Sequence, residues 1–174
     1  MILTPYFLKR GLLSKAVQAA NHSHTFRSMK EVRSILVLYD EKDSEVVEPC
    51  LETLRLMHKQ LSTCVYTKRK DASNPNPDAS CLQVCEKELS WLSYPAKVLR
   101  KQFEALEADL LIDLTREGNY VMRYLMLLHP STFKVGPQRS EAEFYDLAIL
   151  MKPKGDLTYL FGQILFYLQS MHSK

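Results

Sequence analysis

The chain has 174 residues, of which 46% are hydrophobic and 25% are charged. This composition is typical of one globular domain and excludes collagen-like, disordered and disulfide-scaffold proteins. The formal net charge of +3 is too small an excess for a domain devoted to binding nucleic acid phosphates, so nucleic acid is not expected as a partner.

Targeting and cysteine patterns favour a cytoplasmic protein. The apolar runs are far shorter than the roughly 20 residues of a transmembrane helix, and no transmembrane segment is expected. Lys9 and Arg10 follow the first apolar stretch, whereas in a signal peptide the charges precede it. The four cysteines form no zinc-ligand or Cys-x-x-Cys pattern, so we predict reduced thiols, no metal and no cofactor. Cys81 and Cys85 are expected to share a helical face.

Residues 1–33 form the first of two predicted regions. Thr4 and Pro5 are typical of a helix start, and apolar residues at helical spacing predict an amphipathic helix over about residues 5–20. Six lysines or arginines against one acid give this region a local charge of +5, which leaves −2 for the rest of the chain. The segment could pack on the domain, lie on RNA or anionic lipid, or dock on a partner protein.

From residue 34 onward, apolar runs alternate with amphipathic segments. Strands are predicted at 35–39, 63–67, 89–92, 110–114, 133–136 and 146–151. Helices are predicted after Asp43, with an apolar stripe reaching Leu61 and Pro49 inside, at 95–106, at Tyr120–Leu128 and after Asp156. This alternation predicts an α/β fold, a single three-layer Rossmann-like domain over residues 34–174 with a mainly parallel sheet.

Tyr120–Leu128 is apolar almost all round. A helix of this kind is either deeply buried or uses its second face against a partner, so it is the predicted surface for a protein partner or a homo-oligomer. His58 and His129 follow predicted helices at their C-terminal ends. A partly charged imidazole is favourable there, which predicts a capping role for both.

Ligands of open parallel sheets usually bind beyond the carboxyl ends of the strands. This rule selects the polar residues and glycines that follow the predicted strands: Asp40, Asp43, Lys68, Arg69, Asp113, Thr115, Arg116, Gly118, Asn119, Gly136, Arg139 and Lys154. The loop 113–119 leads into a helix N-terminus, where backbone N–H groups favour an anion. Arg116, Gly118 and Asn119 are therefore candidates to hold a phosphate or carboxylate. In the alternative interpretation, Asp113 and Thr115 satisfy loop backbone groups, Asn119 caps the helix and Arg116 points to water.

The sequence contains neither a glycine-rich nucleotide-binding motif nor a G-x-S-x-G nucleophile elbow. If the chain is an enzyme, Asp43 or Asp113 is the candidate general base. Arg116, Arg139 or Lys154 would then hold the anionic group of a phosphorylated or sugar-type substrate.

Three segments carry a resemblance to a known family. SILVLYD at 34–40, DLLIDLT at 109–115 and FKVG at 133–136 resemble the N-terminal, acceptor-side domain of heptosyltransferase-type glycosyltransferases. The resemblance covers about residues 34–138 and implies a Rossmann-like fold. Those enzymes place a loop with small residues and a catalytic acid after the first strand, whereas the loop at 41–44 reads Glu-Lys-Asp-Ser and contains no glycine. No second nucleotide-sugar domain fits in 174 residues, so transfer activity is not expected. The whole chain, including FYDLAIL at 144–150, is also similar to a family of small uncharacterised bacterial proteins.

We therefore expect a cytoplasmic, non-catalytic α/β module that binds a partner protein or a small anionic ligand through the strand-end loops. One alternative is a small transferase-like enzyme acting on a phosphorylated or sugar-type substrate. The other is peripheral attachment to RNA or an anionic membrane through residues 1–33, which salt should weaken steeply.

Overall fold

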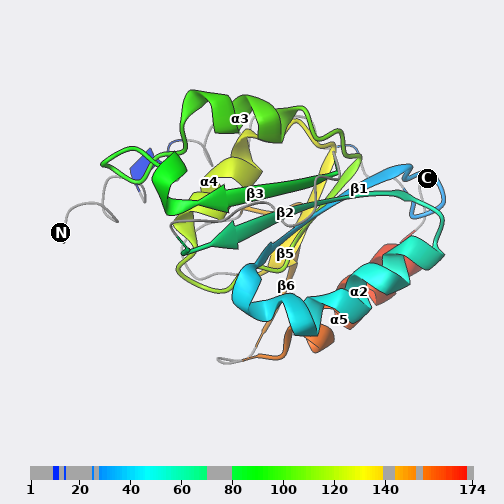
Figure 1. The fold of residues 1–174 in the computed structure, drawn as a ribbon. Coiled ribbons are helices and arrows are strands. Elements are labelled where there is room, and N and C mark those ends of the chain that lie inside the picture. The colour runs from blue at the N-terminus through cyan, green and yellow to red at the C-terminus, as the bar shows by residue number, and fades with distance from the viewer. Residues whose placement is uncertain are drawn as a thin grey trace.

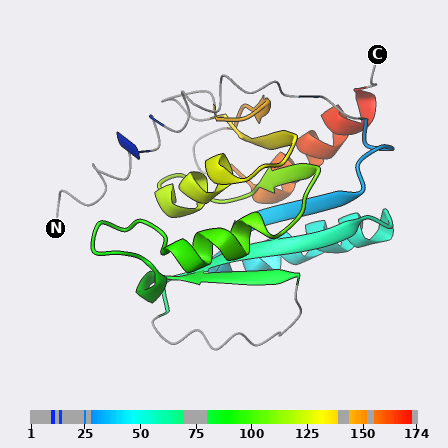
Figure 2. The ribbon, with the colours of Figure 1, turned by 90° about the horizontal axis from the view of Figure 1, so that it is seen from above.

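The computed structural model describes residues 10–11, 14, 25, 28–69, 80–138, 144–151 and 155–171. These residues form an α/β fold in which one parallel sheet lies between two layers of helices (Figure 1 and Figure 2). The predicted three-layer, Rossmann-like arrangement is confirmed. The predicted helix over residues 5–20 lies almost wholly outside the described residues, as do Arg139 and Lys154.

Strands and helices alternate along most of the chain. The strands are β1 (Ser34–Asp40), β2 (Gln60–Thr67), β3 (Cys81–Cys85), β4 (Leu110–Asp113), β5 (Phe133–Pro137) and β6 (Leu147–Ile149). The helices of the described residues are η1 (Glu41–Asp43), α2 (Ser44–Leu56), η2 (Glu86–Glu88), α3 (Lys97–Glu104), α4 (Tyr120–Leu128) and α5 (Leu157–Ser170). The sheet order is β3-β2-β1-β4-β5-β6, and every neighbouring pair is parallel.

β1 is buried on both faces because helices cover both sides of the sheet. Ile35 and Val37 belong to the core that α2 and α5 complete, whereas Leu36 and Leu38 belong to the core shared with α3 and α4. Figure 1 shows these two pairs of helices on opposite sides of the strands. Burial on both faces explains why the sequence of β1 is a continuous apolar run and does not alternate between apolar and polar residues.

The strand order reverses between β1 and β4. The chain moves outward from β1 through β2 to β3, returns to β4 beside β1, and then moves outward on the other side through β5 and β6. The loops that leave β1 and β4 therefore diverge at the carboxyl edge of the sheet. In folds of this class, that reversal is the usual place for a ligand.

The third predicted strand is wrong. β3 is Cys81–Cys85, whereas Leu89 makes only an isolated antiparallel bridge to Pro95 and Trp91 is exposed in the turn between them. β3 is an edge strand with only its last two residues fully buried, so its sequence lacks the apolar run of a central strand. The helical face predicted for Cys81 and Cys85 is wrong for the same reason, because both residues lie in this strand.

The first long helix is shorter than its apolar stripe predicts. α2 ends at Leu56, and Leu61 lies in β2. His58 follows with a left-handed φ of 56°, and its N–H donates to the Arg55 carbonyl, so the backbone leaves the helix there. Pro49 lies inside α2 on its exposed side.

α4 is enclosed by its own domain. All residues from 121 to 127 are buried, and the apolar ones pack against Leu36, Leu38 and Leu111 of the sheet. Of the two interpretations of Tyr120–Leu128, the structure therefore supports the deeply buried helix. Within the described part of the chain, no helix is long and apolar enough to cross a membrane.

His129, directly after α4, is a buried neutral histidine. The Ser131 N–H donates to His129 Nδ1 at 3.1 Å, and Nε2 lies 2.6 Å from the Leu106 carbonyl oxygen. Because Nδ1 accepts, Nε2 carries the proton and donates it to that oxygen. Burial lowers the pKa of His129 to about 4, so the predicted partly charged cap is wrong for this residue.

Candidate functional site

Two carboxylates mark the strand ends at the reversal of strand order. Asp40 ends β1 and Asp113 ends β4, and their exposed fractions are 7% and 0%. A buried carboxylate is stable only if hydrogen-bond donors surround it. The donors of these two residues therefore define the local structure of the site.

Asp40 joins the loop after β1 to the loop after β4. Its Oδ2 accepts a hydrogen bond from the Arg116 N–H at 3.1 Å, and its Oδ1 accepts one from Asn119 Nδ2 at 2.6 Å. Asn119 Oδ1 accepts from the Met122 N–H at 3.1 Å, which caps α4. The predicted capping by Asn119 is confirmed, and the same side chain also connects the helix to β1.

Asp43 and Arg116 form an ion pair across the same gap between strands. Arg116 Nε lies 3.0 and 2.9 Å from Asp43 Oδ1 and Oδ2, and Arg116 Nη2 lies 2.8 Å from Oδ1. The Asp43 side chain is 8% exposed and the Arg116 side chain 40%. The hydrogen bonds to Asp43 raise the pKa of Arg116, which therefore stays positively charged. Arg116 is held by the protein and does not simply point to water.

The ion pair uses only one edge of the guanidinium. Among the residues that the structure describes, none accepts a hydrogen bond from Arg116 Nη1. Two positions further along, Gly118 has a φ of 89°, and no heavy atom lies within 4 Å of the position that a Cβ would occupy. Within three residues, the loop thus contains a guanidinium held in place, at Arg116, and a backbone position without a side chain, at Gly118.

Asp113 serves its own loop. Its Oδ1 accepts hydrogen bonds from the Thr115 N–H at 2.8 Å and from the Thr115 hydroxyl at 2.6 Å, and its Oδ2 accepts from the Tyr145 hydroxyl at 2.5 Å. Both oxygens are engaged and neither reaches solvent. This arrangement matches the interpretation in which Asp113 and Thr115 satisfy loop backbone groups.

Tyr145 is the site residue that sequence reasoning missed. It lies just before β6, and Gly136 in β5 makes room for its ring, because a Cβ at Gly136 would lie 2.4 Å from Tyr145 Cε1. Gly136 is buried within β5 and lies against this ring. A glycine inside a strand often marks the close approach of another group, and that signal was present in the sequence.

A separate contact occupies the end of β2. The Thr67 hydroxyl donates to Glu41 Oε2 at 2.5 Å, and Arg69 Nε lies 3.7 Å from the same oxygen. Arg69 is therefore paired with Glu41, apart from the Arg116 loop. No group of histidine, cysteine and acidic residues in the described ranges could hold a metal ion.

The structure brings four of the predicted site residues into one hydrogen-bonded network: Asp40, Asp43, Arg116 and Asn119. Asp113 and Thr115 form an adjacent network with Tyr145. Gly118 lies between Arg116 and Asn119 in the loop of the first network, whereas Gly136 is buried within β5.

Comparisons with known proteins identify a family. A family model described as a family of unknown function, DUF6913, matches residues 6–171. No curated protein and no solved structure matches the chain. The resemblance to heptosyltransferase-type glycosyltransferases therefore stays a prediction.

Proposed function

The chain belongs to DUF6913, a family of unknown function, and from its strand-end geometry we propose that it is a non-catalytic binding module for a small anionic ligand. The proposed site is the loop 115–119 at the carboxyl ends of β1 and β4. The observation that carries the proposal is the Asp43–Arg116 pair. A buried carboxylate fixes one edge of a guanidinium at the reversal of strand order and leaves the Nη1 edge for a ligand.

Positioning before binding makes such a cation effective. Arg116 is held through its side chain by Asp43 and through its backbone N–H by Asp40, so little conformational freedom remains to be lost on binding. The N-terminus of α4 follows within four residues, and its backbone dipoles also favour negative charge. A carboxylate or phosphate that contacts Nη1 would form a charge-assisted hydrogen bond in this position.

The same contacts support a binding role over proton transfer. A general base needs a free lone pair within reach of its substrate. Both oxygens of Asp43 face Arg116, and both oxygens of Asp113 accept hydrogen bonds inside the fold. The transferase-like alternative would require Asp43 to leave Arg116.

Calorimetric titration tests the proposal. We expect saturable binding of at least one of three probes, namely inorganic phosphate, a hexose phosphate and a nucleoside diphosphate. Arg116→Gln should weaken that binding by about tenfold or more, because a hydrogen bond to a charged group contributes roughly 1.5 kcal/mol or more. Arg69→Gln is the matched control, since it removes a strand-end arginine that is paired with Glu41, and it should leave the affinity unchanged.

A stability control separates binding from folding. Arg116→Gln leaves the buried Asp43 without its cation and is expected to lower the unfolding midpoint. The double variant Asp43→Asn/Arg116→Gln removes both charges and should recover stability but not binding. Failure of wild-type protein to bind any of the three probes, or full binding by the double variant, would refute the proposal.

Exposed aromatic side chains on α5 favour the alternative in which the chain binds a protein partner. This helix contains no charged residue, and Tyr159 and Phe166 on its surface are 56% and 63% exposed. A partner or a second copy would cover such aromatic side chains. Light scattering at increasing concentration tests self-association: Phe166→Glu should abolish any dimer, and a strict monomer at all concentrations excludes one.

Attachment through residues 1–33 stays a prediction, because most of that region lies outside the described residues.

A further inference from the structure

A pocket lies at the amino edge of the sheet, opposite the Arg116 loop. Its volume is about 670 Å³, and its lining comes from the segment before β1, the turn between α2 and β2, and the C-terminal end of α5. Figure 1 and Figure 2 both show the start of β1 and the end of α5 at the same end of the molecule. The volume lies within the range of small-molecule sites.

Three methionines make the apolar part of the pocket. Met29 is buried in the core between the sheet and the α2–α5 layer, and the half-buried Met57 and Met171 pack against the same core. Methionine side chains are unbranched and polarizable, so they adapt to flexible apolar ligands. The pocket therefore opens directly onto the hydrophobic core through side chains that can adjust to an aliphatic chain.

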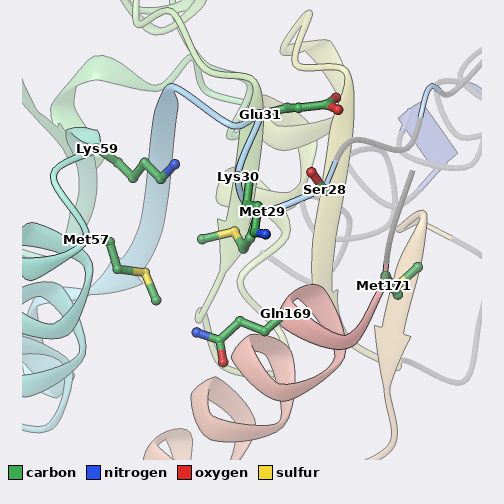
Figure 3. A pocket seen from close by; sticks show the side chains of 8 residues that line it. All are labelled: Ser28, Met29, Lys30, Glu31, Met57, Lys59, Gln169 and Met171. Carbon is green, nitrogen blue, oxygen red and sulfur yellow. The ribbon is translucent and has the colours of Figure 1, made fainter. Parts of the chain in front are cut away.

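Two lysines give the pocket a positive rim. Lys30 and Lys59 line it together with the Gln169 amide. In Figure 3, Lys59 and Met57 extend from one side, and Met29 and Gln169 from the other, toward the space between them. The Glu31 carboxylate points away from Lys59 and Met57 in the same view. Neither lysine has an ion-pair partner within the described ranges.

We propose that this pocket binds a monomeric medium-chain carboxylate, with its aliphatic chain on the three methionines and its carboxylate at Lys30 and Lys59. An apolar floor beside two ammonium groups that no described residue pairs complements an amphipathic anion, whereas it repels an amphipathic cation. The site does not depend on the function proposed above, because it shares no residue with the Arg116 loop and lies at the other edge of the sheet.

Methyl NMR of the full chain with ¹³C-labelled methionines tests where the ligand binds. Decanoate, kept below the concentration at which it forms micelles, should shift the methyl signals of Met29, Met57 and Met171 with saturation. Met122 and Met126 are internal controls, because both are fully buried in the core on the opposite face of the sheet, and their signals should not move. Absence of a saturable shift, or equal shifts at the two controls, would overturn the proposal.

Variants and related probes test what the pocket recognises. Lys59→Gln should raise the Kd for decanoate about tenfold, as expected for the loss of one charge-assisted hydrogen bond. Lys101→Gln, an exposed lysine of α3, should leave the Kd unchanged, and both variants should keep the wild-type unfolding midpoint. The proposal is wrong if decyltrimethylammonium binds as tightly as decanoate, if hexanoate does so, or if the protein binds only anionic vesicles and not the free carboxylate.

Discussion

Individual side chains at the carboxyl edge are positioned by close contacts that leave little tolerance. The Tyr145 ring lies 2.4 Å from the position that a Cβ of residue 136 would occupy, and its hydroxyl is one of the donors that stabilise the buried Asp113. Because residue 136 in β5 has no side chain, the Tyr145 ring fits there and its hydroxyl reaches Asp113 at the end of β4.

Gly136→Ala should destabilise the protein. Its Cβ would come within 2.4 Å of Tyr145 Cε1, so the ring must shift away from Asp113, at a cost of about 1–3 kcal/mol in the free energy of unfolding. Gly162→Ala is the matched control, because no heavy atom lies within 4 Å of its Cβ position in α5. That change should stabilise the helix by about 0.5–1 kcal/mol in the same urea titration. Equal effects of the two alanines would contradict the packing described for Tyr145.

Lys134→Met should stabilise the protein at neutral pH. Lys134 is buried in β5 beneath the last turn of α4, with Nζ 3.5 Å from the Leu127 carbonyl oxygen, and burial lowers its pKa to about 8. Below pH 8 the folded protein carries this buried charge, so methionine should raise the free energy of unfolding by on the order of 1–3 kcal/mol. The gain should shrink as pH rises from about 8 to about 10.5, where the folded wild-type protein loses the charge first.

Urea titrations at pH 7 and pH 10 measure both parts of the Lys134 prediction. Lys101→Met on the exposed surface of α3 serves as the control and should change stability by less than about 0.5 kcal/mol. Destabilisation by Lys134→Met at both pH values would show that the contact with Leu127 contributes more than burial of the charge costs.

At the scale of elements, two helices begin with capping side chains that differ in what else they hold. Asn119 caps α4 and also donates to Asp40, whereas Asp156 caps α5 by accepting from the Thr158 N–H at 2.9 Å. Asp156→Ala should therefore cost about 1 kcal/mol of unfolding free energy, the usual value of a cap. Asn119→Ala should cost about 1–3 kcal/mol more, since it also leaves a buried Asp40 oxygen without a donor.

Asn119→Asp separates the two roles in the same chemical-denaturation series. An aspartate keeps the cap of α4 but places a second carboxylate beside Asp40, so it should still destabilise the protein. If Asn119→Asp is as stable as wild type, the contact between Asn119 and Asp40 has no energetic role.

The sequence predicts elements well where one signal dominates. β1 and β4 are central strands buried on both faces, and α4 and α5 begin directly after their caps Asn119 and Asp156. β3 was missed because an edge strand needs no apolar run, and the end of α2 was missed because the apolar spacing continues into β2. Local periodicity carries no information about where the backbone leaves a helix or joins a sheet edge.

The candidate site was only half predictable for a related reason. The strand-end rule selects Asp40, Asp43 and Arg116 from local sequence, but the pairing of Asp43 with Arg116 joins residues 73 positions apart. That pairing depends on β4 returning to the side of β1, which is a property of the strand order. Tyr145 likewise contacts Asp113 only because β5 and β6 pair beside β4 in this strand order.

At the scale of the whole molecule, stability should fall in mildly acidic solution. His129 has a pKa of about 4 in the folded protein and 6.5 as its ordinary value, so between these values the unfolded chain binds more protons. The free energy of unfolding should therefore decrease as pH falls from about 6.5 to about 4, by up to about 3 kcal/mol from this residue.

Thermal unfolding across that pH range measures the effect of His129. His129→Gln should flatten the dependence, because glutamine does not titrate. The exposed His58 is the control, and His58→Asn should leave the slope unchanged, since asparagine also tolerates the left-handed backbone at that position. A wild-type slope that survives in His129→Gln would assign the pH dependence to other groups.

We propose that the Asp43–Arg116 pair presents a cation for a small anion at the reversal of strand order. Amide NMR of ¹⁵N-labelled protein titrated with inorganic phosphate tests it most directly. We expect saturable shifts of the Arg116, Glu117 and Gly118 amides and of the Arg116 Nε–H signal in the wild-type protein. The backbone amide shifts at residues 116–118 should be lost in Asp43→Asn/Arg116→Gln. Shifts confined to Lys30 and Lys59 at the other edge, or none at residues 116–118, would contradict it.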